Sequence, residues 1–379
     1  MQVGGISVVE DQQMFACFGM GTLKRFPCPP AMVRRRLSRR TPHAIRLLFA
    51  VLVLAGATAF KPSTPPRLRS AILISWDGAL REHINDSMKR NQLPNLAQLI
   101  KEGRMVDIEV SGHVTDTKSG HAQMLTGYDP SLTGVFSNTR FRPIPRGTSI
   151  FERLQQAFGK KDIATIMLTG KAMGLGPGAP RISAETDAPN SVSDESSDEE
   201  KQARRLEKIR AAGEQNVSGQ PFYLVKSALT AWDGDMPRDA RAVGQKALGF
   251  IDKFGPEGRF FLFVHFGDAD VNGHRYGEDS REYDDALVAL DGWLGRIVAQ
   301  LKADGLYNLT ALYITSDHGF DVATTHHGKA THSFLATNDP QLTSAGEQRD
   351  ITPTVLQALG VDISTITPAL PGKSLRKKD

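Results

Sequence analysis

Three aspartates in this sequence of 379 residues each follow a short run of apolar residues. The aspartates are Asp77, Asp270 and Asp317, and the runs are residues 71–76, 260–266 and 309–316. Runs of this length predict buried parallel strands, whose carboxyl ends meet at one edge of a sheet. A single aspartate at such a place is more often a turn residue. Three carboxylates packed together need a compensating cation, so the pattern indicates a metal centre.

Histidines lie close to the same aspartates in the sequence. His274 comes four residues after the second aspartate, and His318 comes directly after the third. His326 and His327 follow a few residues later. Imidazole and carboxylate groups without a thiolate form a ligand set that suits zinc better than manganese or iron. The residue types therefore predict a zinc site at the strand ends.

Four sequence blocks around these residues resemble signature blocks of the alkaline phosphatase superfamily. They are Ser75-Trp76-Asp77-Gly78, Thr117-Lys118-Ser119-Gly120-His121, Asp270-Val271-Asn272-Gly273-His274-Arg275-Tyr276-Gly277 and Ser316-Asp317-His318-Gly319-Phe320. The resemblance covers nearly all of residues 71–360. It is strongest to the type I phosphodiesterase and nucleotide pyrophosphatase branch. It implies that the chain hydrolyses a small phosphate ester or nucleotide.

The resemblance also implies a threonine nucleophile. In this superfamily the second block opens with the nucleophile, and a Thr-Gly pair closes the block nine residues later. Here the pair is Thr126-Gly127, which places the nucleophile at Thr117. The competing hydroxyls of Thr115 and Ser119 do not fit this spacing. The implied intermediate is a phosphothreonine.

By the same resemblance, the blocks supply the ligands of two divalent metal ions, which we expect to be zinc. The ligands of the first ion are Asp77, Thr117, Asp317 and His318, and those of the second are Asp270, His274 and a late histidine. His327 fits the late ligand best, with His326 and His332 as alternatives. Asn138 resembles the asparagine that contacts a non-bridging phosphoryl oxygen, although an ordinary turn residue fits its context equally well.

The pattern of residues 270–277 favours a phosphodiesterase or nucleotide pyrophosphatase over the alternative, a phosphomonoesterase. Lys118 and Gly120 depart from the usual residues of that branch. A monoesterase needs extra cations for its dianionic phosphate, and Lys118, Arg140 or Lys171 would supply them. A sulfatase ranks lower because the sequence lacks the Cys-x-Pro-Ser-Arg context. A non-catalytic binding protein on the same scaffold also ranks lower, because no ligand or nucleophile is missing.

Strand patterns alternate with helix patterns along the rest of the chain. Strands are predicted at residues 71–76, 162–168, 260–266 and 309–316, and helices at 93–102, 149–158, 238–254, 283–301 and from 350 onward. Such alternation predicts an α/β fold. With the resemblance, we expect an alkaline phosphatase-like sandwich with a largely parallel central sheet and helices on both faces. This catalytic domain would span residues 60–379.

The composition changes at about residues 174–235. Gly and Pro are dense at first, Ser191 to Glu200 is acidic and rich in Ser, and residues 201–212 are charged and helix-prone. We expect an inserted cap segment there. A solvated surface loop and a substrate-facing lid fit the composition equally well.

Residues 1–59 are predicted to be an N-terminal extension and a signal peptide. A basic stretch up to Arg46 precedes an apolar run, residues 47–54, and the small residues Ala57-Thr58-Ala59. This order is typical of secretory signal peptides, so we expect export to the periplasm or the outside. An uncleaved N-terminal anchor is the alternative and would be the sole stable membrane association. Because about 30 residues precede the basic stretch, we hypothesise that translation begins at Met32.

The basic net charge of +4 also comes from this N-terminal segment. The segment holds eight of the 46 Lys and Arg residues and two of the 42 acidic residues, which leaves 38 basic against 40 acidic side chains. A near-neutral body gives no indication of specific nucleic-acid binding. Cys17 and Cys28 lie upstream of the predicted cleavage site, so no thiolate ligand is expected in the mature chain.

Overall fold

The three apolar runs form the centre of the main sheet. They are β1 (Ser70–Trp76), β7 (Arg259–Phe266) and β8 (Thr310–Thr315). β1 lies between the other two and is parallel to both, with Leu73 paired to Phe263 on one side and to Tyr313 on the other. Almost every side chain of the three strands is buried, as expected for parallel strands with helices on both faces.

The computed structural model describes residues 68–171, 175, 181–182, 217–218, 221–234 and 238–377. The predicted signal peptide and most of the predicted insertion, including its acidic run, lie outside the described residues. Within the described part of the chain, no helix combines the length and the apolar character needed to cross a membrane.

Eight strands make up the main sheet, in the order β10-β2-β9-β8-β1-β7-β3-β6. The strands outside the central three are β2 (Arg104–Glu109), β3 (Ile163–Thr169), β6 (Ala231–Asp233), β9 (His332–Thr337) and β10 (Gly346–Glu347). β9 is antiparallel to both of its neighbours, and the other pairings are parallel. The predicted α/β fold with a largely parallel sheet is confirmed.

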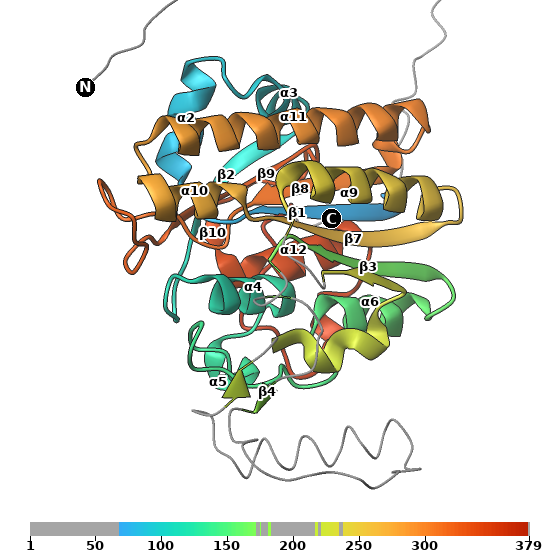
Figure 1. Cartoon of the computed structure of the whole chain (residues 1–379). Helices are drawn as coiled ribbons and strands as arrows, with labels where there is room; N and C mark the ends of the chain where they lie inside the picture. The colour runs from blue at the N-terminus through green and yellow to red at the C-terminus, as the bar shows by residue number, and fades with distance from the viewer. Residues whose placement is uncertain are drawn as a thin grey trace, which may run out of the picture. The chain divides into compact units, whose positions relative to one another are not determined.

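Helices cover both faces of the sheet (Figure 1). α2 (Arg81–Lys89), α3 (Pro94–Glu102), α9 (Ala240–Phe254) and α11 (Arg281–Ala303) pack on one face, and α4 (Thr117–Thr126), α6 (Ile150–Phe158) and α12 (Ile351–Ala358) on the other. Alternate side chains of β1 enter the two hydrophobic clusters: Ile72 and Ile74 one, Ala71 and Leu73 the other. Because successive side chains of a strand point to opposite faces of the sheet, each central strand contributes residues to both hydrophobic clusters.

The sequence of α11 gives the helix one apolar face, which packs against the sheet. Tyr283, Leu287, Leu290 and Leu294 are buried, and their spacing of four, three and four residues places them on one helical face. The helix begins slightly earlier than predicted, because the Ser280 side chain accepts a hydrogen bond from the backbone N–H of Tyr283. Such an N-cap satisfies a backbone donor that the first turn leaves free.

The end of the predicted insertion belongs to the main sheet. β6 lies within residues 174–235 but pairs in parallel with β3 as the edge strand. An inserted segment, as predicted, would therefore have to end before Ala231. Two short strands from the predicted insertion, β4 (Arg181–Ile182) and β5 (Val217–Ser218), pair only with each other, in a separate two-stranded sheet.

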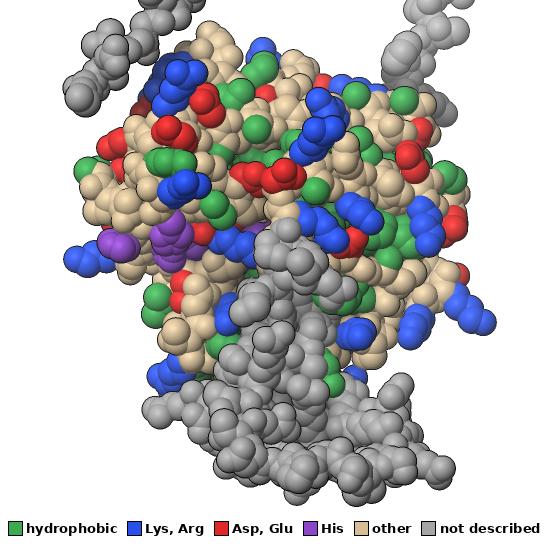
Figure 2. Space-filling view, in the orientation of Figure 1, with side chains coloured by type: hydrophobic (Ala, Val, Ile, Leu, Met, Phe, Trp, Pro, Cys, Tyr) green, Lys and Arg blue, Asp and Glu red, His purple; other side chains and the backbone are tan. Residues whose placement is uncertain are grey.

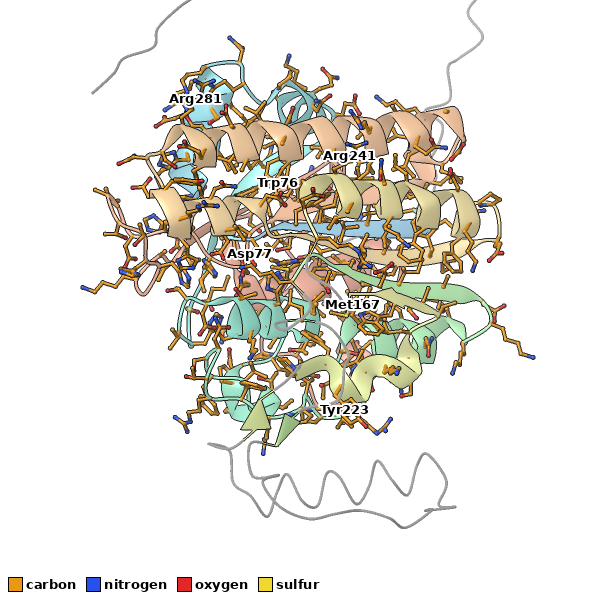
Figure 3. All side chains as sticks on the ribbon, viewed as in Figure 1. Trp76, Asp77, Met167, Tyr223, Arg241 and Arg281 are labelled. Atoms are coloured by element: carbon orange, nitrogen blue, oxygen red, sulfur yellow. The ribbon has the colours of Figure 1, made fainter. Side chains whose placement is uncertain are left out.

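The carboxyl ends of β1, β7 and β8 lie at the same edge of the sheet because the three strands are parallel. Figure 3 shows Asp77 directly after Trp76 at the end of β1, between the two helical layers. α10 (Asp268–Tyr276) starts just after β7 and carries Asp270 in its first turn. The topology thus brings the predicted aspartates together.

Candidate metal centre

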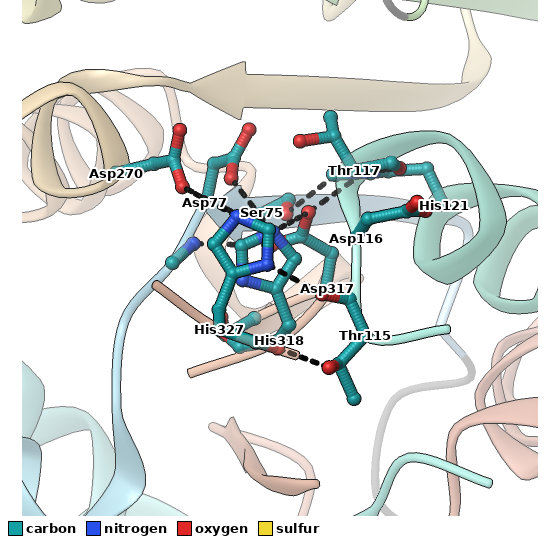
Figure 4. A network of polar contacts seen from close by, with 12 residues as sticks. Ser75, Asp77, Thr115, Asp116, Thr117, His121, Asp270, Asp317, His318 and His327 are labelled. Carbon is teal, nitrogen blue, oxygen red and sulfur yellow. Dashed lines mark hydrogen bonds and ion pairs between the residues drawn. The ribbon is translucent and has the colours of Figure 1, made fainter. Parts of the chain in front are cut away.

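Three carboxylates meet at this edge of the sheet, as predicted. Asp77 and Asp317 are completely buried, and Asp270 is almost so. The ring of His318 lies among them, with its Nε2 atom 3.6 Å from Asp77 Oδ1, 4.0 Å from Asp270 Oδ1 and 3.3 Å from Asp317 Oδ2 (Figure 4). We refer to Asp77, Asp270 and Asp317 as the carboxylate cluster.

Gly78 connects two members of the carboxylate cluster. Its backbone N–H donates a hydrogen bond of 3.1 Å to Asp317 Oδ1, and its φ of 72° lies in the left-handed region. A Cβ atom at this position would lie 2.9 Å from the Cα of Asp270. The Asp-Gly pair after β1 is therefore required both by backbone conformation and by close packing.

Three histidines have the same orientation toward the cluster. In His274, His318 and His327 the Nδ1 atom lies 2.5 to 3.0 Å from a backbone carbonyl oxygen, to which it donates its proton. The lone pair of each Nε2 atom is then left to face the site. This arrangement is typical of metal-binding histidines, whose second nitrogen is held by a hydrogen bond.

The Nε2 atoms of His274 and His327 lie 3.0 Å apart, and they lie 3.4 Å and 3.9 Å from Asp270 Oδ1. Figure 2 shows histidine side chains (purple) at the surface close to α10. His274 is exposed, whereas His318 is buried. The cluster is thus buried on one side and accessible on the other.

Several acceptor atoms in the centre have no hydrogen-bond partner among the described residues. They are Asp77 Oδ1, Asp270 Oδ1, Asp317 Oδ2 and His318 Nε2. Buried polar atoms are almost always paired, and leaving them unpaired is costly. Bound cations would satisfy these four acceptor atoms, which converge on one place without a hydrogen-bond donor in the described part of the chain. The residues present therefore fit a metal centre.

Two groups of ligand atoms lie close enough together to hold one ion each: Asp77, Asp317 and His318, and Asp270, His318 and His327. His274 adjoins the second group through its contacts with His327 and Asp270. Of the three late histidines considered, His327 is the one in the site. His326 is exposed, and His332 pairs with Glu82 at 2.8 Å on β9.

Thr117 is the first residue of α4 and lies beside the carboxylate cluster. Asp116 caps this helix, because its side chain accepts a hydrogen bond from the backbone N–H of Ser119. The Thr117 Oγ1 atom lies 3.5 Å from the ammonium of Lys171. In the first turn, Asn138 and Asp116 accept the backbone N–H groups of Lys118 and Ser119, and the N–H of Thr117 has no acceptor among the described residues. This N–H and the positive end of the helix dipole favour an anion at this place.

The two competing hydroxyls are used elsewhere. Ser119 Oγ donates to the carbonyl oxygen of Val114 at 2.6 Å, and Thr115 Oγ1 donates to the carbonyl oxygen of His327. Both side chains hold the backbone that leads into α4. Of the three hydroxyls, the geometry therefore favours that of Thr117 as the nucleophile.

Asn138 lies next to the N-terminus of α4, as expected for a phosphoryl contact. Its side-chain oxygen accepts a hydrogen bond of 2.9 Å from the backbone N–H of Lys118, and its own backbone N–H donates to Asp116. The residue is exposed. With the oxygen held in this way, the side-chain amide group is left to act as the donor.

Burial and charge shift the acidities of the cluster in opposite directions. Burial and the neighbouring charge of Asp77 raise the pKa of Asp317 to about 7. Burial alone would also raise the pKa of Asp77, but Lys171 and His265 hold it well below its usual value. Asp317 is therefore the carboxyl that retains a proton when no metal is bound.

The sequence did not identify the side chains that hold the cluster in place. His265 on β7 accepts the backbone N–H of Gly170 at Nδ1, so its Nε2 carries the proton and donates it to Asp77 Oδ2 at 2.8 Å. His121 lies 3.3 Å from Asp317 Oδ2, and burial lowers its pKa to about 4. A polar residue inside the apolar run 260–266 was the available signal for His265.

Comparison with known proteins identifies relatives of this chain. Residues 71–363 match the family described as type I phosphodiesterase / nucleotide pyrophosphatase. The chain is 23% identical over 274 residues to human bis(5'-adenosyl)-triphosphatase ENPP4, covering 72% of this chain and 51% of the relative. It is 35% identical over 278 residues to rat ectonucleotide pyrophosphatase/phosphodiesterase family member 7, covering 73% and 55%. The chain thus spans about half the length of the curated relatives it matches.

A solved structure shares the fold. It is that of murine ectonucleotide pyrophosphatase/phosphodiesterase 5, an inactive threonine-to-alanine variant in complex with AMP. The TM-score is 0.51 at 13% identity, covering 81% of this chain and 97% of the other.

Proposed function

The chain belongs to the type I phosphodiesterase / nucleotide pyrophosphatase family, and we propose that it hydrolyses phosphodiester or nucleotide pyrophosphate bonds in small molecules. One observation carries this proposal. Unpaired oxygen and nitrogen atoms of the carboxylate cluster and His318 converge beside a threonine hydroxyl at a helix N-terminus. That combination supplies ligands for cations, a nucleophile and a place for an anion.

Two divalent ions, which we expect to be zinc, would bind to two sets of side chains. The sets are Asp77, Thr117, Asp317 and His318, and Asp270, His274 and His327. When bound, such ions lower the pKa of a coordinated hydroxyl and offset the negative charge of the attacking and leaving oxygens. The ligand chemistry, with imidazole and carboxylate and no thiolate, supports zinc.

The proposed reaction proceeds in two steps at Thr117. In the first, the hydroxyl loses its proton to solvent and its oxygen forms a bond to phosphorus. The bond to the leaving oxygen breaks, and the leaving group departs with the electron pair and gains a proton. In the second, water attacks the phosphothreonine, the Oγ1–phosphorus bond breaks, and Thr117 regains its proton. Asn138 donates to a non-bridging oxygen in both steps.

A nucleotide is the favoured substrate class within this proposal. The human relative is named for bis(5'-adenosyl)-triphosphate, and the murine structure holds AMP. Because these proteins are distant in sequence and the curated ones are longer, they guide the choice of substrates to test. The predicted signal peptide supports action outside the cytoplasm, and its removal from the mature protein can be checked by N-terminal sequencing.

Turnover and metal analysis of the purified protein test the function together. We expect hydrolysis of bis-p-nitrophenyl phosphate and of a dinucleoside triphosphate, loss of this activity in a strong chelator, and recovery when zinc is added. Metal analysis is expected to give two ions per chain. Full activity in chelator, or one ion per chain at full activity, would rule out the two-metal site.

A further inference from the structure

Lys171 reaches into the metal centre from the end of β3. Its ammonium lies 2.7 Å from Asp77 Oδ2 and also contacts Asp270 Oδ2. The other oxygen of each carboxylate, Oδ1, has no hydrogen-bond partner within the described part of the chain and faces His318. Lys171 thus pairs with one oxygen of each carboxylate and leaves the other oxygen to the metal side.

The third donor of the ammonium faces the nucleophile. A lysine ammonium has three N–H groups, of which two point to Asp77 and Asp270. Thr117 Oγ1 lies 3.5 Å from Nζ, which is too long for a strong hydrogen bond. On a phosphoryl group bonded to Oγ1, the non-bridging oxygens are only two bonds from that atom and fall within reach of this donor.

The other two cations considered for phosphate binding have different surroundings. Lys118 Nζ donates to the carbonyl oxygen of Asn138 at 2.9 Å and lies 3.8 Å from the centre of the Phe141 ring. The Arg140 guanidinium lies 4.2 Å from the centre of the Phe136 ring. Among the three, Lys171 is the cation in contact with the reacting hydroxyl.

We propose that Lys171 is a catalytic residue that binds a non-bridging oxygen of the phosphoryl group on Thr117, and that it thereby gives the site activity toward phosphate monoesters. The inference rests on the proposed function and extends its substrate class. A monoester carries one more negative charge on its phosphoryl group than a diester does, and a fixed ammonium beside the nucleophile matches this charge. Thr117 would form the bond to phosphorus, the bond to the alcohol oxygen would break with the electron pair leaving on the alcohol, and water would release inorganic phosphate.

The experiment compares one monoester with one diester in matched variants. Metal-loaded wild type, Lys171→Met and Lys171→Arg are assayed at pH 8 with p-nitrophenyl phosphate and bis-p-nitrophenyl phosphate. We expect Lys171→Met to lower kcat/KM for the monoester by about tenfold more than for the diester, because a charge-assisted hydrogen bond to the dianion is lost. Lys171→Arg keeps the positive charge, so its ratio of kcat/KM for the monoester to kcat/KM for the diester should lie between those of Lys171→Met and wild type. Lys160→Met, an exposed lysine far from the centre, is the control.

Binding measurements separate this role from a structural one. Calorimetry with inorganic phosphate should show weaker binding to metal-loaded Lys171→Met at unchanged metal content and thermal midpoint. An equal fall in kcat/KM for the two esters in Lys171→Met would overturn the proposal. A loss of bound metal large enough to account for the whole fall would also overturn it. If Lys171→Met does not fold, the same ratio is read from Lys171→Arg and Lys171→Gln. Absence of turnover of either ester by wild type would instead refute the proposed function.

Discussion

At the scale of single residues, the environment of each hydroxyl near the N-terminus of α4 gives it a different expected role. Replacing Thr117 by Ala removes the attacking oxygen without removing a buried charge, so we expect kcat to fall by roughly 10³ or more while folding survives. Thr117→Ser keeps the hydroxyl and should retain part of the activity. Steady-state kinetics on bis-p-nitrophenyl phosphate, with circular dichroism for folding, measure both effects.

Ser119→Ala is the matched comparison. Its hydroxyl lies within hydrogen-bond distance of two acceptors, the carbonyl oxygen of Val114 and the side chain of Asp116, so we expect a loss of stability and only a mild loss of turnover. An inactive Ser119→Ala together with a nearly normal Thr117→Ala would contradict the assignment of the nucleophile. The comparison distinguishes the two hydroxyls because they are two residues apart on the same helix.

Residue types, spacing and the family resemblance pointed to the side chains that meet in the candidate metal centre, but not to the residues that hold them in place. His274 is four residues from Asp270 on one helix, so its position follows from sequence spacing. His265 holds Asp77 across 188 residues, through a contact between two adjacent strands. No local spacing encodes such a contact. The same applies to Lys171, whose place depends on β3 lying beside β7.

At the scale of elements, α4 packs against the loop after β8 with no room for a side chain at Gly120. A Cβ atom there would lie 2.7 Å from the backbone oxygen of Asp317. Gly→Ala in a helix interior normally stabilises by about 1 kcal/mol. Here we expect Gly120→Ala to destabilise by about 1–3 kcal/mol through overpacking, and to lower metal occupancy because Asp317 moves. Denaturant unfolding and metal analysis measure the two effects.

Gly292→Ala on α11 provides the control for Gly120→Ala. A Cβ atom at Gly292 meets no atom within 4 Å, so this substitution should be neutral or stabilising. Equal effects of the two substitutions would contradict the packing argument. The close approach of α4 to the Asp317 loop requires a residue without a Cβ atom at Gly120.

The central strands and the long helices were predictable from the sequence, whereas β2 and β9 were not. The central strands are apolar along their whole length and were predicted within one or two residues. β2 is mostly partly buried or exposed, with Ile108 as its one buried side chain, so its sequence carries no strong pattern. β9 is mostly buried but antiparallel to its neighbours, and the order of strands in the sequence does not specify that direction.

At the scale of the whole molecule, the metal centre links stability to pH. Without metal, the folded protein holds a proton on Asp317 up to about pH 7, whereas the unfolded chain loses it near pH 4. The folded state therefore binds more protons between these values, and the contribution of Asp317 to stability falls as the pH rises. Burial lowers the pKa of His121 to about 4, which gives the opposite slope from about pH 4 to 6.5, and burial also lowers the pKa of His265, which acts in the same direction.

Asp317→Asn removes the titration of Asp317 and leaves His121 and His265 in place, and it also removes a charge that raises the pKa of His318. Both raised pKa values favour the folded state at low pH, so we expect the stability of metal-free wild type, relative to this variant, to fall as the pH rises from about 4 to about 7. With metal the sign reverses: a bound cation requires the ionised carboxylate, so metal affinity rises with pH up to about 7. Ligands that bind only the folded state raise its melting temperature. Calorimetry should therefore show the gap in melting temperature between zinc-loaded and chelator-treated wild type widening from pH 5 to pH 8, with a smaller and flatter gap in Asp317→Asn. A gap of the same size at both pH values in wild type would show that Asp317 does not exchange its proton for a metal ion.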